Sequence, residues 1–295
     1  MNKYSVDIRG GKIMKKATAF VLALVMTLGM GATVMAEENT ALDRVLESGK
    51  IVLATDAAWA PFEYMEGENV VGADIEIAAK IAEHLGVELE IVNVAFDSLP
   101  MYLENGEADI VLAAMTVTEE RAEVMEFSAP YCDSSQYIIV KEGDENVEFI
   151  DDLGGYIVGV HLGTTGDFLV SDEVNMGVLM GTNAMVQQYK DLSIAAMGLN
   201  AGDVQAIVCD RQLAENICTV NEGLVCFEAK YADGSSTEEQ YAVAAKKGET
   251  ALIEKVNEVV VPLKEDGTID QFIVDHSARS SALNEEAEAE EEAAE

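Results

Sequence analysis

Hydrophobic positions along the chain follow two alternating patterns. Short apolar runs, such as residues 51–55 and 109–114, are bounded by glycine or polar residues, which predicts buried strands. Between such runs, apolar residues recur at helical spacing over residues 75–85 and 250–264. Alternating strands and helices predict an α/β fold, in which ligands bind just beyond the carboxyl ends of the strands.

One segment in the second half of the chain echoes a segment in the first half. In residues 103–114 and again in residues 199–210, a helix ends at glycine and a buried strand begins three residues later. The alignment places Ala114 and Asp210 at equivalent strand ends. Two similar βαβ lobes that share a cleft are the simplest architecture with this pattern.

A polar turn with an arginine follows the strand at residues 109–114. The motif Thr116-Val-Thr-Glu-Glu-Arg121 leaves the strand and opens a helix whose first turn carries carboxylates, where the helix dipole favours them. Thr116 and Arg121 therefore lie where a ligand would bind. The alternative for Arg121 is a surface ion pair with Glu119 or Asp109, although exposed pairs contribute little.

Two further loops follow predicted strands. Asp56-Ala-Ala-Trp-Ala-Pro-Phe62 is irregular because the residue before a proline avoids the helical region. We expect Phe62 in the core and Trp59, the only tryptophan, as an exposed ligand platform. His161-Leu-Gly-Thr-Thr-Gly-Asp167 opens a helix, where free N–H groups suit a carboxylate, although a plain N-cap would also explain it.

These motifs occur in the order found in a known family. The strand at residues 51–55, Trp59-Ala-Pro-Phe62, the helix at 75–85 and Thr116-Val-Thr-Glu-Glu-Arg121 resemble the polar amino acid-binding (family 3) solute-binding proteins of ABC importers. The resemblance extends over residues 41–272. It implies a two-lobed periplasmic-binding-protein-like fold of type II, with two hinge crossings. It also implies extracytoplasmic binding of a free amino acid, and delivery to a membrane permease by cleft closure.

The resemblance assigns roles to the charged ends of the ligand. Arg121 would clamp the carboxylate with its planar fork, helped by the backbone N–H groups of Thr116 and Thr165. Asp210, the Thr116 hydroxyl and the Ala114 carbonyl would hold the ammonium group.

Four other residues are expected around the ligand's side chain. By resemblance Trp59 and Phe96 flank it, although Phe96 could equally cap the core. Asp56 and His161 are the pocket positions that should face it. Asp56 would repel an acidic side chain, and an apolar one would leave Asp56 desolvated and unpaired. We therefore expect glutamine, arginine, lysine or histidine, with cystine as an outside candidate.

The organisation of the chain follows from these assignments. Lobe 1 is expected at residues 37–132 and 239–283, lobe 2 at 137–234, and the hinge at 133–136 and 235–238. A last short helix is predicted at residues 269–274. Residues 284–295 are almost entirely Glu and Ala and are predicted to be a disordered acidic tail.

The N-terminus has the pattern of a secretory signal peptide. Lys15-Lys16 precedes the uncharged residues 17–36, which end in Val34-Met35-Ala36, so cleavage after Ala36 is expected. An uncleaved membrane anchor is the alternative. The protein is expected to be exported, periplasmic or extracellular, and without a lipid anchor because no cysteine lies near the cleavage site. Translation is expected to start at Met14.

Composition restricts the partners. The net charge of −37 argues against nucleic acid or anionic lipid, and a monomer is expected. The three histidines are scattered, and no metal, P-loop or dinucleotide motif occurs, so no metal or cofactor is expected. Cys218 and Cys226 could form a disulfide or remain free thiols, and Cys209 looks structural.

Two other classes of protein share this fold. An enzyme resembling prephenate or arogenate dehydratase would need a general acid, for which only His161 and Asp56 are candidates. Neither has a recognisable partner or nucleophile in the sequence, so binding without catalysis is favoured. The sensing domain of a receptor would need a membrane segment after residue 272, and the sequence has none there.

Overall fold

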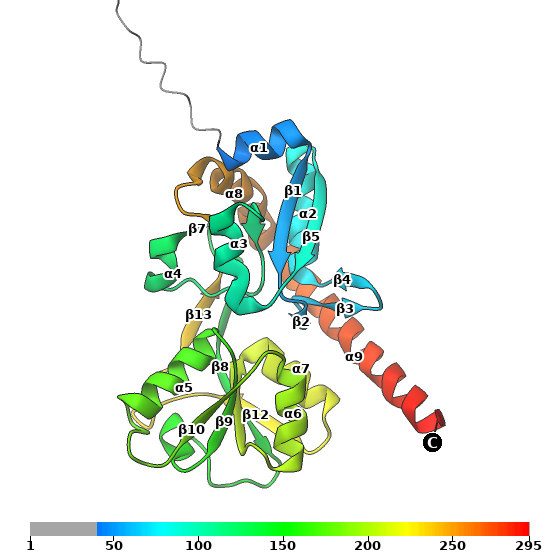
Figure 1. Ribbon diagram of the computed structural model, residues 1–295. Helices are drawn as coiled ribbons and strands as arrows, with labels where there is room; N and C mark the ends of the chain where they lie inside the picture. Colours follow the sequence, from blue (N-terminus) through cyan, green and yellow to red (C-terminus); the bar gives the residue numbers. More distant parts are fainter. Residues whose placement is uncertain (1–39, 295) are drawn as a thin grey trace, which may run out of the picture. The chain divides into compact units, whose positions relative to one another are not determined.

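A mixed five-stranded sheet forms the centre of the first lobe (Figure 1). The computed structural model describes residues 40–294, and side chains are described for residues 40–283. The strand order is β5-β1-β6-β14-β7, with β1 parallel to β5 and β6, and β14 antiparallel to β6 and β7. These strands are β1 Lys50–Thr55, β5 Glu88–Asn93, β6 Ile110–Val111, β7 Met125–Phe127 and β14 Ala244–Lys246.

Helices and a small second sheet complete this lobe. The helices are α1 Ala41–Ser48, α2 Ala73–Leu85, η1 Phe96–Ser98, α3 Leu99–Asn105, α4 Glu119–Val124 and α8 Thr250–Glu265. The small sheet contains β2 Ala58–Trp59, β3 Glu63–Glu66 and β4 Asn69–Val71. β1, α2 and α8 confirm the elements predicted from apolar periodicity. Their apolar faces share one buried cluster, as the pattern requires.

The second lobe has its own sheet, in the order β10-β9-β11-β8-β12. β9, β10 and β11 run parallel, whereas β8 is antiparallel to β11 and β12. The strands are β8 Cys132–Lys141, β9 Ile157–His161, β10 Met185–Tyr189, β11 Ala206–Asp210 and β12 Leu224–Glu228. The helices are η2 Ile150–Leu153, α5 Thr165–Asn175, α6 Leu192–Ala201 and α7 Arg211–Val220. The expected two-lobed α/β architecture is therefore present.

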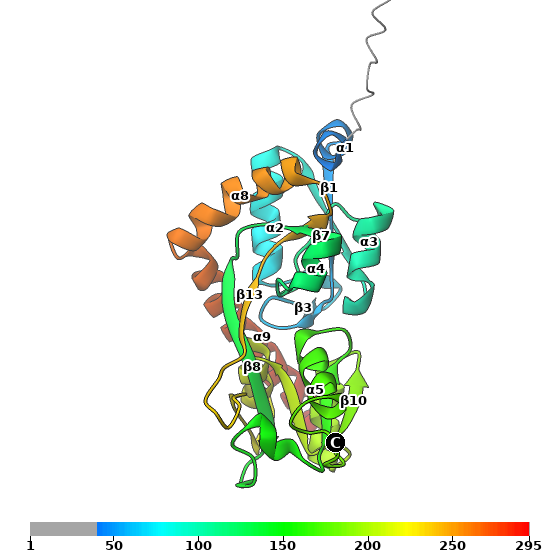
Figure 2. The same cartoon turned by 90° about the vertical axis from the view of Figure 1, so that its left-hand side faces the viewer.

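Two antiparallel strands run side by side between the lobes (Figure 2). β13 Glu238–Tyr241 pairs with the first part of β8, from Tyr241 opposite Cys132 to Glu238 opposite Ser135. From Gln136 onward, β8 pairs with β11 in the second lobe. The exact lobe boundaries and the hinge role of these strands remain predictions. The single strand expected at residues 239–246 is divided into β13 and β14.

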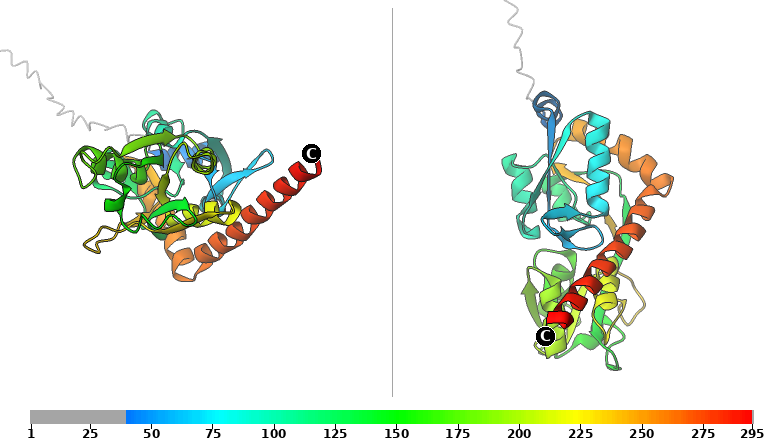
Figure 3. Two further views of the ribbon diagram at one scale, coloured as in Figure 1. Left: turned by 90° about the horizontal axis from the view of Figure 1, so that it is seen from below. Right: turned by 90° about the vertical axis from the view of Figure 1, so that its right-hand side faces the viewer.

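The C-terminal helix is longer than predicted. α9 Thr268–Ala294 has 27 residues, and Figure 3 shows it running from the first lobe past the second. The helix predicted at residues 269–274 is therefore part of a longer helix, and the backbone of residues 284–294 is helical where a disordered tail was predicted. No Gly or Pro interrupts residues 268–294, and Ala and Glu are strong helix formers, so the helix continues. α9 contacts α2, α8 and α7.

Other predictions have different outcomes. The predicted signal peptide, its cleavage after Ala36 and the start at Met14 lie outside the described residues. Within residues 40–294 no helix is long and apolar enough to cross a membrane, and no group of His, Cys, Asp and Glu side chains could hold a metal. Cys218 and Cys226 are free thiols that hydrogen-bond to each other, and Cys209 is buried in β11.

Candidate functional site

Strand ends from both lobes bring the predicted binding residues together. Asp56 follows β1, Ala114 lies beyond β6, and Asp210 ends β11. One small cavity is lined by Thr164 and by seven of the nine predicted residues, which are Trp59, Phe96, Ala114, Thr116, Arg121, Thr165 and Asp210. Asp56 and His161, the other two predicted residues, lie beside Trp59 and Phe96.

Arg121 faces the cleft from the first lobe. Its Nη1 donates to the Thr116 carbonyl at 2.7 Å, and its Nη2 donates to the Gly163 carbonyl of the second lobe at 3.1 Å. The guanidinium carbon lies 5.3 Å from the centre of the Phe96 ring. Among the described residues Arg121 has no ion pair with Glu119 or Asp109, so the surface-pair alternative was wrong: the side chain is 91% buried and turns away from them.

Burial changes the electrostatics of Arg121. It lowers the pKa of the guanidinium from its ordinary value, while Asp210 and Glu239 act in the opposite direction. An arginine remains charged under these conditions. The result is a desolvated cation whose carbonyl partners neutralise no charge, which is the environment that a ligand carboxylate would complete.

Asp210 faces Arg121 from the second lobe. Its carboxylate accepts a hydrogen bond from Gln136 Nε2 at 2.7 Å and another, very short, from the Tyr241 hydroxyl. Burial and the nearby Glu239 raise its pKa to about 8, against the opposing effects of Tyr241, Gln136 and Arg121. A cation placed here would favour the ionised form of Asp210.

Three residues in this network escaped the sequence analysis. Gln136 Nε2 also donates to Glu239 Oε1 at 3.0 Å, and the Thr116 hydroxyl donates to Glu239 Oε2 at 2.9 Å. Gln136, Glu239 and Tyr241 all lie on the paired strands β8 and β13. The sequence contained a signal for Gln136, which lies in the predicted crossing at residues 133–136, whereas Glu239 and Tyr241 lie just beyond the predicted crossing at 235–238.

Asp56, His161 and two aromatic rings form the side-chain end of the site. His161 Nε2 lies 3.5 Å from Asp56 Oδ2, and its ring stacks on Trp59 at 5.3 Å between centroids. The ring of Phe96 is 6.0 Å from that of His161. Phe96 also belongs to a buried cluster of the first lobe, so it both lines the cavity and caps the core.

Two expectations for this end of the site were wrong. Trp59 is only 5% exposed, because the second lobe covers it through His161. Asp56 and His161, which have no recognisable partner in the sequence, are partners of each other. Burial raises the pKa of Asp56 to about 6, although the Phe96 N–H donates to it at 2.9 Å. Burial lowers the pKa of His161.

The N-terminus of α5 faces the same cavity. Thr164 is the N-cap, and its hydroxyl accepts from the Asp167 N–H. The Gly163 N–H donates to the Asp167 carboxylate at 3.0 Å, so this group is satisfied internally. Thr165 is the first helical residue, and its N–H therefore has no acceptor within the helix. The N-cap and the candidate anion site are thus present together.

The lobes lie close together at this point. The volume of this small cavity is about 10 Å³, roughly enough for one water molecule. A Cβ added at Gly163 would lie 3.2 Å from the Cβ of Asp97 across the cleft. An amino acid could therefore bind only if the lobes first separate.

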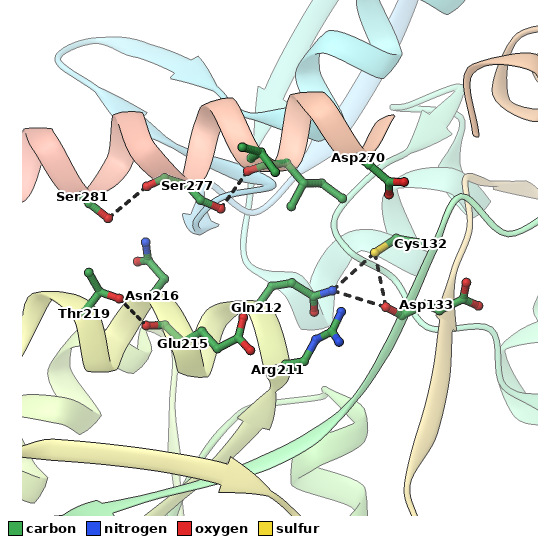
Figure 4. A pocket seen from close by; sticks show the side chains of 12 residues that line it. Cys132, Asp133, Arg211, Gln212, Glu215, Asn216, Thr219, Asp270, Ser277 and Ser281 are labelled. Carbon is green, nitrogen blue, oxygen red and sulfur yellow. Dashed lines mark hydrogen bonds between the residues drawn. The ribbon is translucent and has the colours of Figure 1, made fainter. Parts of the chain in front are cut away.

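Two larger hollows differ from this cavity. One, of about 670 Å³, adjoins Phe96 and Arg121 on one side and Phe168 of the second lobe on the other. Another, of about 580 Å³, lies between α7 and α9 (Figure 4). In it, Gln212 Nε2 donates to the Asp133 carbonyl at 3.3 Å. None of the predicted binding residues lines the hollow in Figure 4.

Comparison with known proteins identifies the family. Residues 51–276 match the model for bacterial extracellular solute-binding proteins, family 3. The L-cystine-binding protein TcyJ of Escherichia coli (strain K12) is 27% identical, over 86% of this chain and 92% of its own. A probable histidine-binding protein of Neisseria gonorrhoeae is 30% identical, over 78% and 84%. The crystal structure of AbpA from Streptococcus pneumoniae bound to L-arginine has a TM-score of 0.74 and 30% identity, over 81% and 98%.

Proposed function

This chain belongs to the bacterial extracellular solute-binding proteins, family 3, and on that premise we propose that its ligand is a free L-amino acid with a cationic or polar side chain. Members of the family are non-enzymatic components of amino-acid transport, so the dehydratase alternative is set aside. The partner would be the permease of an ABC importer. We further propose that a signal peptide exports the protein.

One observation carries the proposal: Arg121 and Asp210 line the same cavity from opposite lobes. A free amino acid presents a carboxylate and an ammonium group on one carbon, and these two residues match that pair of charges. The ligand carboxylate would replace the carbonyl partners of Arg121. Its ammonium group would replace Gln136 and Tyr241 at Asp210, with Glu239 close by.

Charge selects among the amino acids. Asp56, Asp210 and Glu239 lie around the cleft, and the guanidinium of Arg121 lies among them. An added positive charge would reduce this imbalance, whereas an acidic side chain would increase it. A long cationic side chain would place its methylene groups between Trp59 and Phe96 and its donors at Asp56. Arginine is therefore the ligand to test first, ahead of lysine, histidine and glutamine.

The relatives support this choice without deciding it. Solved structures of relatives at 30–34% identity include complexes with arginine, and one ancestral arginine-binding protein was also solved with glutamine. Curated relatives are described as binding cystine, histidine or arginine. Relatives with the same fold thus bind different amino acids, so the family alone does not identify the ligand.

A thermal-shift panel of the twenty amino acids tests the proposal on protein stripped of ligand by unfolding and refolding. At a hundredfold excess over Kd, a ligand stabilises the folded state by about 2.7 kcal/mol, or roughly 5–10 °C in Tm for a chain of this size. Arginine should give the largest shift. A largest shift with glutamate, aspartate or leucine would refute the assignment of Asp56, and no shift with any amino acid would refute the proposed function.

A further inference from the structure

Two carboxyl groups in the first lobe, neither of which lines the ligand cavity, lie within hydrogen-bonding reach of each other. Glu63 of β3 and Asp74 of α2 are both fully buried. Asp74 Oδ2 accepts hydrogen bonds from the Ala114 N–H at 2.9 Å and from the Tyr131 hydroxyl at 2.8 Å. The other oxygen of Asp74 and both oxygens of Glu63 have no donor among the described residues.

A single proton shared between Glu63 and Asp74 would supply a hydrogen bond to carboxyl oxygens that otherwise have no donor. An ionised carboxylate only accepts hydrogen bonds, so two carboxylates in contact can bond to each other only when one of them carries a proton. Asp74 already receives two donors, which favour its charged form, whereas Glu63 receives none. The proton therefore belongs on Glu63, which donates it to Asp74.

The groups around the pair agree with this assignment. Among the described residues, the groups that act on this pair include Asp56, the Tyr131 hydroxyl and the Cys132 thiol, and none of these three is a cation. Burial and the adjacent Asp74 raise the pKa of Glu63 well above its ordinary value, and burial raises that of Asp74 to about 6. Two negative charges in this place would be uncompensated.

The backbone holds the two carboxyl groups together. Gly72 precedes α2 with φ of 142°, and a Cβ at this position would lie 1.9 Å from the Phe62 carbonyl oxygen. The same Cβ would lie 2.8 Å from the Cα of Glu63. Only glycine therefore lets β3 approach the start of α2 this closely. The contact between Glu63 and Asp74 is imposed by the fold.

The pair is also tied to the ligand cavity. Ala114, whose N–H binds Asp74, lines that cavity and has φ of 45°, a conformation that non-glycine residues seldom adopt. Such a conformation persists only when its surroundings hold it in place. The hydrogen bond from Ala114 to Asp74 supplies that restraint next to the carbonyl that would face the ligand's ammonium group.

We propose that Glu63 and Asp74 share one proton, and that the pair is a positioning element that fixes the main chain at Ala114 for ligand binding. The positioning role rests on the proposed function, whereas the shared proton does not. Loss of the proton would place two like charges in contact. Their repulsion would loosen the Asp74–Ala114 bond and weaken the binding of the amino acid.

Infrared spectroscopy of the protein without ligand tests the shared proton. At neutral pH the wild type should show the carbonyl stretch of a protonated carboxylic acid that is absent from Glu63→Gln. Asp210, another buried carboxyl with a raised pKa, is the control, because Asp210→Asn should leave the Glu63 band in place. Identical spectra for wild type and Glu63→Gln in this region would overturn the proposal.

Calorimetry with arginine tests the positioning role. Glu63→Ala should weaken binding roughly tenfold, as expected when one hydrogen bond to a charged group no longer holds the site. Glu63→Gln keeps a donor toward Asp74 and should retain most of the affinity that Glu63→Ala loses.

Each outcome has a separate meaning. Equal affinities for the Gln and Ala variants would refute the positioning role. If Glu63→Ala does not fold, the Gln variant and the infrared spectra still decide. If the wild type binds no amino acid, the proposed function fails, while the infrared result still shows whether the proton is shared.

Discussion

At the scale of single residues, Arg121 and Asp210 are expected to carry most of the binding energy. Each is buried at the cleft, so its removal would leave a ligand charge without a partner. Arg121→Ala and Asp210→Ala should each cost roughly 2–5 kcal/mol of binding free energy. Folding should survive, because both side chains face the cleft. Calorimetry and thermal melts measure the two effects, and near-wild-type affinity in either variant would remove that residue from the site.

Asp56 should make the binding of a cationic ligand depend on pH. Burial raises its pKa to about 6, so the carboxyl is ionised above that pH and neutral below it. As the pH falls through 6, Asp56 loses the charge that attracts a cation, and protonation of His161 would add repulsion. Affinity for arginine should then decrease by up to about tenfold per pH unit.

The control for this prediction is Asp56→Asn. This variant should bind arginine more weakly at neutral pH, by roughly 1.5–3 kcal/mol, since it loses a charged hydrogen-bond acceptor. It should also lose the part of the pH dependence that is due to Asp56. Calorimetry between pH 5 and pH 8 compares the two proteins, and equal slopes would show that Asp56 does not face the ligand's side chain.

At the scale of elements, α9 connects the two lobes on the side away from the cleft. Asn216 Nδ2 of α7 donates to the Ser280 hydroxyl at 2.9 Å, and His276 Nδ1 lies 3.0 Å from the Tyr64 hydroxyl of the first lobe. If the bond between Asn216 and Ser280 breaks when the lobes separate, it stabilises the arrangement with the lobes close together.

Asn216→Ala should weaken ligand binding modestly. One neutral hydrogen bond contributes about 0.5–1.5 kcal/mol, so Kd should rise by roughly two- to tenfold. Ser281→Ala is the matched control, because the Ser281 hydroxyl donates only to the Ser277 carbonyl of its own helix at 3.0 Å. Calorimetry on both variants distinguishes them. Equal Kd values would mean that the bond persists in the open form or contributes nothing.

At the scale of the whole molecule, the paired strands β8 and β13 should act as a hinge between the two lobes. A ligand that contacts Arg121 and Asp210 binds the closed lobes better than the open ones, and this difference drives closure. Small-angle scattering should therefore show a smaller radius of gyration with arginine than without it. An unchanged profile at saturation would contradict closure by the ligand.

The sequence by itself determined the architecture and most of the cavity. Apolar periodicity is a local property, so β1, α2 and α8 were predictable, and so was the position of Asp210 at a strand end. The carboxyl ends of parallel strands meet at one edge of a sheet, which is why strand-end residues from both lobes converge on one cavity. A distinctive motif added Arg121.

Only the tertiary structure decided how distant side chains pair. Asp56 contacts His161, and Glu63 contacts Asp74. The local sequence pattern around each of these residues does not predict which other side chain it will meet. The burial of Trp59 likewise depends on how closely the second lobe approaches the first. Pairing and burial are set by the packing of whole elements, and packing also fixes which carboxyl groups keep their protons.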